Sequence, residues 1–180
     1  DGSIKIGTTT SHRKEQRLKE QGALWAIIVA KTLDGFMVRV LEDLVTKELS
    51  ISQAVSTKKK IGGILNPIDE SQAKESLRDT FNSVEKLLMQ TKNIEYEILG
   101  NEWENDRYGS DIWNDVHLYP RSLSTGAHSL RIIDVIGRIC AVSPAKSSDI
   151  FVTDLDPLFG LVLEIGTFPT EDLLVQDALF

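Results

Sequence analysis

Apolar and polar positions alternate in the first half of the chain with two different periods. Ile4 and Ile6 share one face of a strand-like segment, and Ser11 and Gly22 are suited to begin and end a helix. A short apolar run and then an amphipathic stripe follow, which predict a buried strand and a helix. The expected order is strand, helix, strand, helix, over residues 3–7, 12–21, 23–31 and 35–49.

The middle of the chain combines a basic run with a long helical stripe. Lys58, Lys59 and Lys60 precede two glycines, a pattern typical of a solvated loop or, as the alternative, of a patch that contacts phosphate. A helix is predicted over 70–90, with Asp69 or Ser71 as its N-cap. These elements complete a predicted α/β core over residues 1–91.

From about residue 92 the pattern becomes strand-like, which places a soft domain boundary there. A strand over 94–98 and an acidic loop over 101–115 are expected first, the loop carrying Trp103, Tyr108 and Trp113 as packing anchors. Further β segments are expected over residues 129–142, 149–153 and 158–165. The prediction is an α+β protein whose residues 92–180 form an antiparallel β-rich sheet or barrel.

Charge divides the chain unevenly. The 180 residues carry a formal net charge of -7 with a pI near 5.0, which argues against a non-specific nucleic-acid coat protein. Residues 1–60 hold 11 Lys and Arg against 7 Asp and Glu, net +4, so the remaining 120 residues carry -11. A basic, anion-binding function is therefore expected in the N-terminal third.

Cysteine content and hydropathy limit which covalent links, metal sites and cellular locations are expected for the protein. Cys140 is the only cysteine, so an internal disulfide and a cysteine zinc site are excluded, and its apolar neighbours predict a buried side chain. No segment approaches the ~20 apolar residues of a membrane span and no signal peptide precedes the first strand, which predicts a cytoplasmic protein without a membrane partner. Asp1 and Gly2 are turn residues, so we expect a further strand before them.

The opening stretch is the best candidate for chemistry. A strand that leads into Thr8 and Thr9 and then into a helix bearing Arg13 and Lys14 is a common way to hold phosphate oxygens. A solvated surface segment is the structural alternative. A site for a small-molecule phosphate or a nucleotide that uses Thr8, Thr9 and Thr10 is a third hypothesis, without a Walker or dinucleotide glycine pattern to favour it.

This stretch resembles the second half of the core hairpin of the GIY-YIG nuclease superfamily. Lys5-Ile6-Gly7 stands where the YIG element would be, Arg17 where those enzymes have a phosphate-binding arginine, and Glu42 where they have a metal-binding glutamate. The run from Gly7 to Thr32, with Arg13, Arg17 and Gln21-Gly22-Ala23, is similar to an uncharacterised archaeal and bacterial domain-of-unknown-function family with such a core. The resemblance implies catalytic or binding roles for Lys5, Arg17 and Glu42, with Mg²⁺ on Glu42.

One departure changes what the resemblance implies. The tyrosine that helps to activate water in those nucleases is Lys5 here, and an ordinary lysine is a poor base at neutral pH. Phosphate binding is thus favoured over hydrolysis. The first hypothesis is a protein directed at DNA or RNA, either a divergent Mg²⁺-dependent endonuclease or a descendant that binds backbones without cutting. The second is a non-catalytic module whose acidic β-rich half binds a basic protein.

Overall fold

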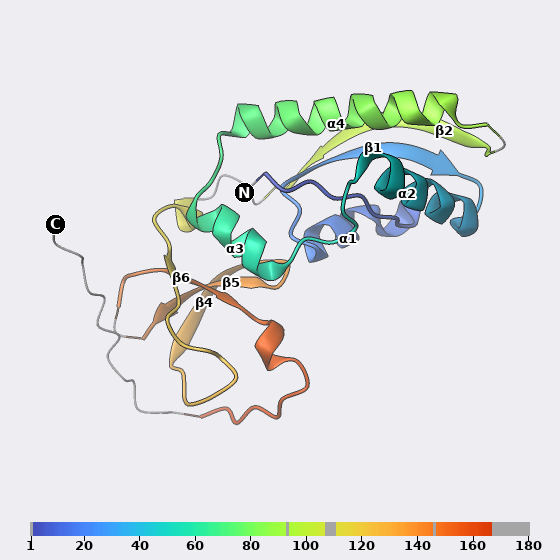
Figure 1. Ribbon diagram of the computed structural model, residues 1–180. Helices are drawn as coiled ribbons and strands as arrows, with labels where there is room; N and C mark the ends of the chain where they lie inside the picture. Colours follow the sequence, from blue (N-terminus) through green and yellow to red (C-terminus); the bar gives the residue numbers. More distant parts are fainter. Residues whose placement is uncertain (1, 93, 107–110, 146, 167–180) are drawn as a thin grey trace.

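The computed structural model describes residues 2–92, 94–106, 111–145 and 147–166. An extended segment leads into a 3₁₀ turn and helix α1, after which one strand, three helices and then five strands follow (Figure 1). The α-helices are α1 (Lys14–Glu20), α2 (Gly35–Leu49), α3 (Thr57–Leu65) and α4 (Glu70–Gln90). The strands are β1 (Trp25–Thr32), β2 (Tyr96–Glu104), β3 (His117–Leu118), β4 (Leu130–Ile136), β5 (Ile139–Pro144) and β6 (Phe151–Asp154). This arrangement confirms the α+β class.

A two-stranded antiparallel sheet and two long helices form the first layer. β1 pairs with β2 from Trp25 opposite Glu104 to Thr32 opposite Tyr96, and α4 runs along the two strands (Figure 1). The apolar stripes of α2 and α4 meet in a shared core. Its buried members are Leu41, Val45, Val84 and Leu88. The sequence predicted α2 and α4 with the bounds that the structure gives them.

Capping explains why these two helices begin where they do. The side chain of Asp34 accepts hydrogen bonds from the backbone N–H groups of Phe36 and Met37, both at 2.8 Å. Asp69 does the same for Gln72 at 3.1 Å, so Asp69 rather than Ser71 is the N-cap of α4. Each cap satisfies amide groups that have no partner inside the helix.

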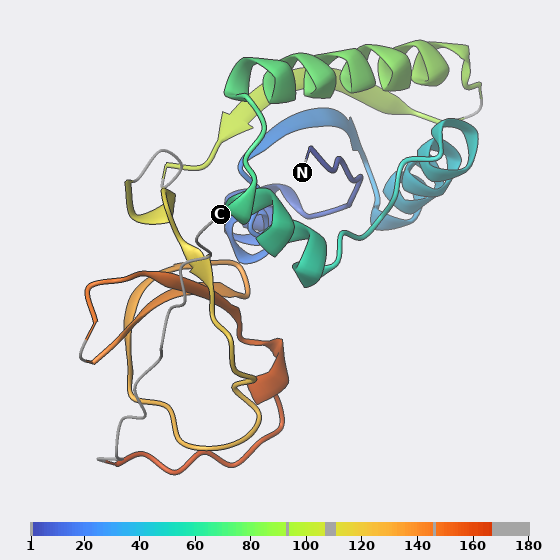
Figure 2. The ribbon, with the colours of Figure 1, turned by 60° about the vertical axis from the view of Figure 1, so that its left-hand side comes forward.

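The second sheet has the order β3-β6-β5-β4, in which β3 pairs with β6 in parallel and the other pairs are antiparallel. Its interior contains Cys140 and Val142 packed with Tyr119 and Phe151, so Cys140 is buried as predicted. Helix α3 covers part of this sheet, and Ile61 packs with Val116, Ile139 and Val152. Both ribbon views place α3 between α4 and the second sheet (Figures 1 and 2).

The pairing of β2 determines which residues belong with the first layer. The soft boundary near residue 92 lies just before β2, and the ladder joins residues 96–104 to β1. A unit that contains β1 therefore also contains β2. The division of the chain into residues 1–91 and 92–180 stays a prediction.

The N-terminal segment departs from its predicted form. Residues 3–7 do not make a strand: the segment is extended and has a single parallel bridge, in which the Ile6 amide donates to the Ser52 carbonyl at 2.9 Å. A strand requires a continuous ladder, and this one bridge does not supply it. Ser11 is also not a side-chain cap, because it lies inside the 3₁₀ turn Ser11–Arg13 that precedes α1.

The Lys58–Lys60 run is helical, so the predicted loop is wrong. Ser56 caps the helix by accepting from the Lys59 amide at 3.3 Å. The apolar residues that follow the lysines give α3 a face to bury on the second sheet. This burial outweighs the low helix propensity of two consecutive glycines, about 1 kcal/mol each.

Two further predictions in the second half are corrected. Residues 101–104 continue β2 instead of opening an acidic loop, because they pair with residues 25–28 of β1. Residues 158–165 form no strand: Asp156–Leu158 is a 3₁₀ turn and the residues after it are exposed. An apolar alternation becomes a strand only beside a partner. Tyr108 lies outside the described residues.

Within the described part of the chain, no helix has the length and apolar character needed to cross a membrane.

Candidate functional site

Two lysines from distant parts of the chain are bound to one residue at the end of α1. The Lys5 ammonium donates to the side-chain oxygen Oε1 of Gln21 at 2.6 Å, and the Lys60 ammonium donates to the backbone oxygen of the same residue at 2.5 Å. Both lysines are partly buried. Gln21 thus holds two positive charges next to each other.

Arg17 and Glu42 complete this group. The pKa of Lys5 is lowered, first by burial and then by the positive charges of Lys60 and Arg17, while the carboxylate of Glu42 acts in the opposite direction. The three residues that the nuclease resemblance singled out, Lys5, Arg17 and Glu42, are therefore close enough for their charges to interact. We call the group formed by Lys5, Arg17, Gln21, Glu42 and Lys60 the basic junction.

The backbone around Gly22 explains how the junction is built. Gly22 has a φ of +66° and follows the last turn of α1, where its N–H bonds to the Lys19 carbonyl at 3.0 Å. A left-handed residue ends the helix and leaves the Gln21 carbonyl free to accept from Lys60. Gly22 also lies against Ile136, so the turn between β4 and β5 touches the end of α1.

Lys60 is a member of the basic junction that the sequence does not assign to the candidate site. The sequence pattern of Lys58–Lys60 is typical of a loop or of a patch that contacts phosphate, and only the helical structure distinguishes the exposure of the three lysines. In α3, Lys58 and Lys59 are exposed, whereas Lys60 is partly buried and turned toward Gln21. The pKa of Lys60 is lowered by burial and then by the charge of Arg138, and Asp156 opposes this.

The remaining predicted phosphate residues lie outside the junction. Thr8 and Thr9 belong to the extended segment before the 3₁₀ turn, Arg13 ends that turn and Lys14 begins α1. No hydrogen bond or ion pair with another described residue joins the side chains of Thr8, Arg13 or Lys14 to the junction. Thr9 donates to the backbone of its neighbour Thr10 at 3.4 Å.

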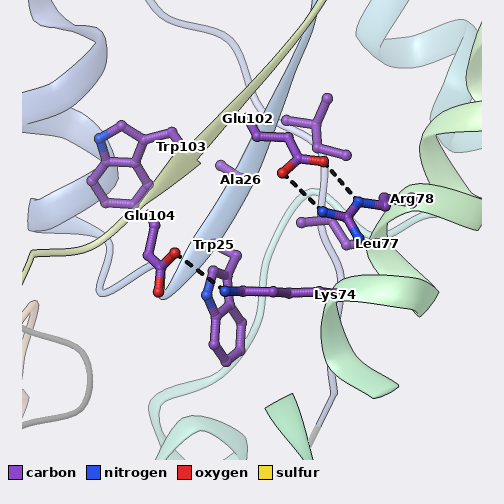
Figure 3. Close-up of a pocket in the computed structure, with 9 residues that line it drawn as sticks. Trp25, Ala26, Lys74, Leu77, Arg78, Glu102, Trp103 and Glu104 are labelled. Carbon is purple, nitrogen blue, oxygen red and sulfur yellow. Dashed lines mark hydrogen bonds and ion pairs between the residues drawn. The ribbon is translucent and has the colours of Figure 1, made fainter. Parts of the chain in front are cut away.

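Cations on the α4 face are neutralised, in contrast to those of the junction. Arg78 makes a two-pronged contact with Glu102, with Nε 2.7 Å from Oε1, and Lys74 lies 2.6 Å from Glu70 and 3.2 Å from Glu104. Figure 3 shows Arg78, Glu102, Lys74 and Glu104 around a cavity of about 230 Å³. The Lys74 ammonium lies 5.4 Å from the centre of the Trp25 ring. Because its carboxylates already bind its cations, this cavity is a poor anion site.

Arg17 has no such partner. It is exposed, and among the described residues no carboxylate lies within ion-pair distance of it. Across the basic junction three cations face one carboxylate. The junction therefore carries a net positive charge.

A metal at this place would depend on Glu42. The described residues contain no group of three or more His, Cys, Asp or Glu that could hold an ion. Mg²⁺ in phosphoryl-transfer sites takes one or two carboxylates and completes its shell with water and phosphate oxygens. A single glutamate fits that pattern, so Glu42 could supply one ligand to Mg²⁺ and the bound phosphate would have to supply others.

The tryptophans of the predicted acidic loop are structural. Trp113 packs beside the cluster that joins α3 to the second sheet, and its Nε1 donates to Asp134 at 3.1 Å. Trp103 lies in β2 and lines the cavity of Figure 3. Both side chains are partly buried.

The lowered pKa of Lys60 predicts how stability depends on pH. Between the lowered pKa of the folded state and the ordinary value near 10.5, the unfolded chain binds more protons, so alkaline pH favours the folded state. The free energy of unfolding of wild type should rise relative to that of Lys60→Met as pH increases from 8 toward 10.5. Urea unfolding across this range measures the difference, and Lys59→Met, on an exposed position of the same helix, serves as control. A constant difference would contradict the burial of the Lys60 charge.

Comparison with known proteins supplies a family but no activity. No curated protein and no solved structure matches the chain. A family model described as "Protein of unknown function (DUF2797)" matches residues 1–117, which include the whole basic junction. This agrees with the expectation of an uncharacterised domain-of-unknown-function family. The chain belongs to the DUF2797 family of proteins of unknown function.

Proposed function

We propose that the protein binds the phosphate backbone of DNA or RNA at the basic junction. The observation that carries the proposal is the attachment of two partly buried ammonium groups, Lys5 and Lys60, to Gln21. Burying like charges side by side is unfavourable for an isolated protein. A phosphate bound between them would relieve the repulsion, and Arg17 would add a planar donor suited to phosphate oxygens.

The nuclease resemblance supports this reading and refines it. The resemblance assigns roles to Lys5, Arg17 and Glu42, and the charges of Arg17 and Glu42 act on Lys5 in the folded protein. In a divergent endonuclease, Arg17 would stabilise charge on the phosphoryl oxygens and Glu42 would hold Mg²⁺. Lys5 supplies positive charge at the place of the missing tyrosine, which favours backbone binding over cleavage.

Arg17 provides the first test. Fluorescence anisotropy with labelled single-stranded DNA, duplex DNA and structured RNA at low salt should show binding that Arg17→Ala weakens about tenfold, the loss of roughly 1.4 kcal/mol of charged contact. The control is Arg131→Ala, which removes an exposed arginine from β4. Absence of binding to all three probes, or equal affinities for wild type and Arg17→Ala, would contradict the proposal.

A Glu42 variant distinguishes a nuclease from a protein that only binds nucleic acid. The same DNA and RNA probes are incubated with wild type and Glu42→Gln in Mg²⁺ or Mn²⁺, and both cleavage and binding are measured. A nuclease would lose cleavage in the variant and keep its affinity. Binding by wild type without cleavage would identify a protein that recognises backbones only.

A protein-interaction module is the second candidate. Residues 61–180 carry a net charge of -11, and an apolar run beyond the second sheet is exposed, with Val162 fully accessible and Ile165 nearly so. This half would steer toward a basic protein and repel nucleic acid. A partner that survives nuclease treatment in a pull-down and requires residues 92–180 would favour this function.

A further inference from the structure

The turn between β4 and β5 carries another cation to the edge of the basic junction. The Arg138 guanidinium lies 2.7 Å from Asp156, and its charge acts on Lys60. Asp156 also accepts a hydrogen bond from Thr57 at 3.1 Å, and Thr57 and Lys60 lie one turn apart on α3. A single carboxylate is thus held between α3 and the β4–β5 turn.

Close backbone packing fixes this turn in place. A Cβ atom added to Gly137 would lie 2.9 Å from the Gly22 amide nitrogen and 3.1 Å from the Glu20 carbonyl oxygen. The residue before Arg138 therefore rests directly on the residues that end α1. The Leu155 amide donates to the Arg138 carbonyl at 2.9 Å, which ties the other side of the turn.

We propose that Arg138 is a further phosphate-contacting residue and that Asp156 is an internal anion which a backbone phosphate replaces on it. This inference rests on the proposed function and extends the binding surface from the first layer to the second sheet. The nucleic acid then crosses the seam between the two sheets, and its phosphates meet cations from the N-terminal segment, α1, α3 and the β4–β5 turn.

The exposure of the Arg138–Asp156 ion pair would allow a phosphate to replace Asp156. The Arg138 side chain is 63% exposed and that of Asp156 34%, and an exposed pair of this kind contributes little stability. A guanidinium offers the same two-pronged geometry to phosphate as to carboxylate. Binding to a nucleic-acid phosphate also releases counterions from the polymer, and this release favours binding. The ion pair with Asp156 has no such contribution.

Four variants test the inference by anisotropy over a range of KCl concentrations. Arg138→Ala should weaken binding of duplex DNA and lower the slope of log affinity against log salt by about 1, and Arg138→Lys should keep the slope. Asp156→Asn should tighten binding roughly threefold or more, because it removes the competing charge. Arg78→Ala is the matched control, since it breaks an exposed arginine–carboxylate pair on the α4 face, and it should leave the slope unchanged.

The outcomes distinguish the two proposals. If Arg17→Ala weakens binding and Arg138→Ala changes neither affinity nor slope, the role of Arg138 is wrong and the proposed function stands. If Arg138→Ala weakens binding but Asp156→Asn leaves affinity unchanged, the replacement of Asp156 is wrong. Wild type that binds no nucleic acid overturns both proposals.

Discussion

Gly137→Ala is expected to lower the free energy of unfolding by about 3 kcal/mol. Gly137 has a φ of +62°, a left-handed conformation that costs a residue with a side chain about 1–2 kcal/mol. The added methyl group would also meet backbone atoms of Gly22 and Glu20 at 2.9 and 3.1 Å, and relieving such contacts costs about 1–3 kcal/mol. Neither neighbour can move without displacing the end of α1.

Gly126→Ala is the control for this substitution. Gly126 has a φ of +85°, and its added methyl would meet only the end of the Arg121 side chain, at 3.3 Å. It should cost about 1 kcal/mol, the conformational part alone. Urea unfolding of both variants compares them directly. Equal losses would show that the seam between α1 and the β4–β5 turn is not closely packed.

Replacing both partly buried lysines, Lys5 and Lys60, should nearly abolish binding while the fold remains stable. Each ammonium is expected to contribute about 1.4 kcal/mol to phosphate binding, so Lys5→Met/Lys60→Met should weaken affinity at low salt roughly 100-fold. Burial already opposes the charged forms of both lysines, and neighbouring cations add to this effect, Lys60 and Arg17 on Lys5 and Arg138 on Lys60, so the free energy of unfolding at pH 7 should not fall. Anisotropy and urea unfolding measure the two effects separately.

The same helix offers a control of equal charge. Lys58→Met/Lys59→Met removes two positive charges from exposed positions of α3. Loss of long-range attraction alone should weaken binding by less than about threefold, since exposed charges are screened within about 10 Å at moderate salt. If the two double variants bind equally, net charge rather than the geometry around Gln21 determines binding.

The sequence predicts best where local signals and burial agree. For α2 and α4 an apolar stripe, an acidic cap and good helix formers coincide, and the predicted bounds match the structure. The C-terminal segments over 129–142 and 149–153 also lie near the observed strands β4, β5 and β6. In these elements the pattern of side chains is sufficient to select the structure.

Predictions failed where contacts between residues distant in the sequence determine the secondary structure. The Lys58–Lys60 run looks like a loop until the second sheet buries the apolar face of α3. Residues 101–104 look like an acidic loop until β1 pairs with them. Lys60 could not be assigned to the site from sequence, because its role depends on a contact with Gln21, 39 positions away.

The residues of the candidate site also divide into those that the sequence predicts and those that only the folded structure reveals. Lys5, Arg17 and Glu42 could be named because the resemblance placed them on successive elements, and their charges interact in the fold. Gln21, Lys60 and Arg138 come from the packing of α1 against α3 and the β4–β5 turn. No local sequence pattern predicts that packing.

The salt dependence of binding tests the central claim most directly. Log affinity for duplex DNA is plotted against log KCl concentration for wild type, Lys5→Met/Lys60→Met and Lys58→Met/Lys59→Met. Because each neutralised phosphate contributes a slope of about 0.9 and the two lysines hold one phosphate between them, the first double variant should lose about 0.9 of the wild-type slope and the second should keep nearly all of it. A wild-type slope near zero, or the same slope for all three proteins, would contradict phosphate binding at the basic junction.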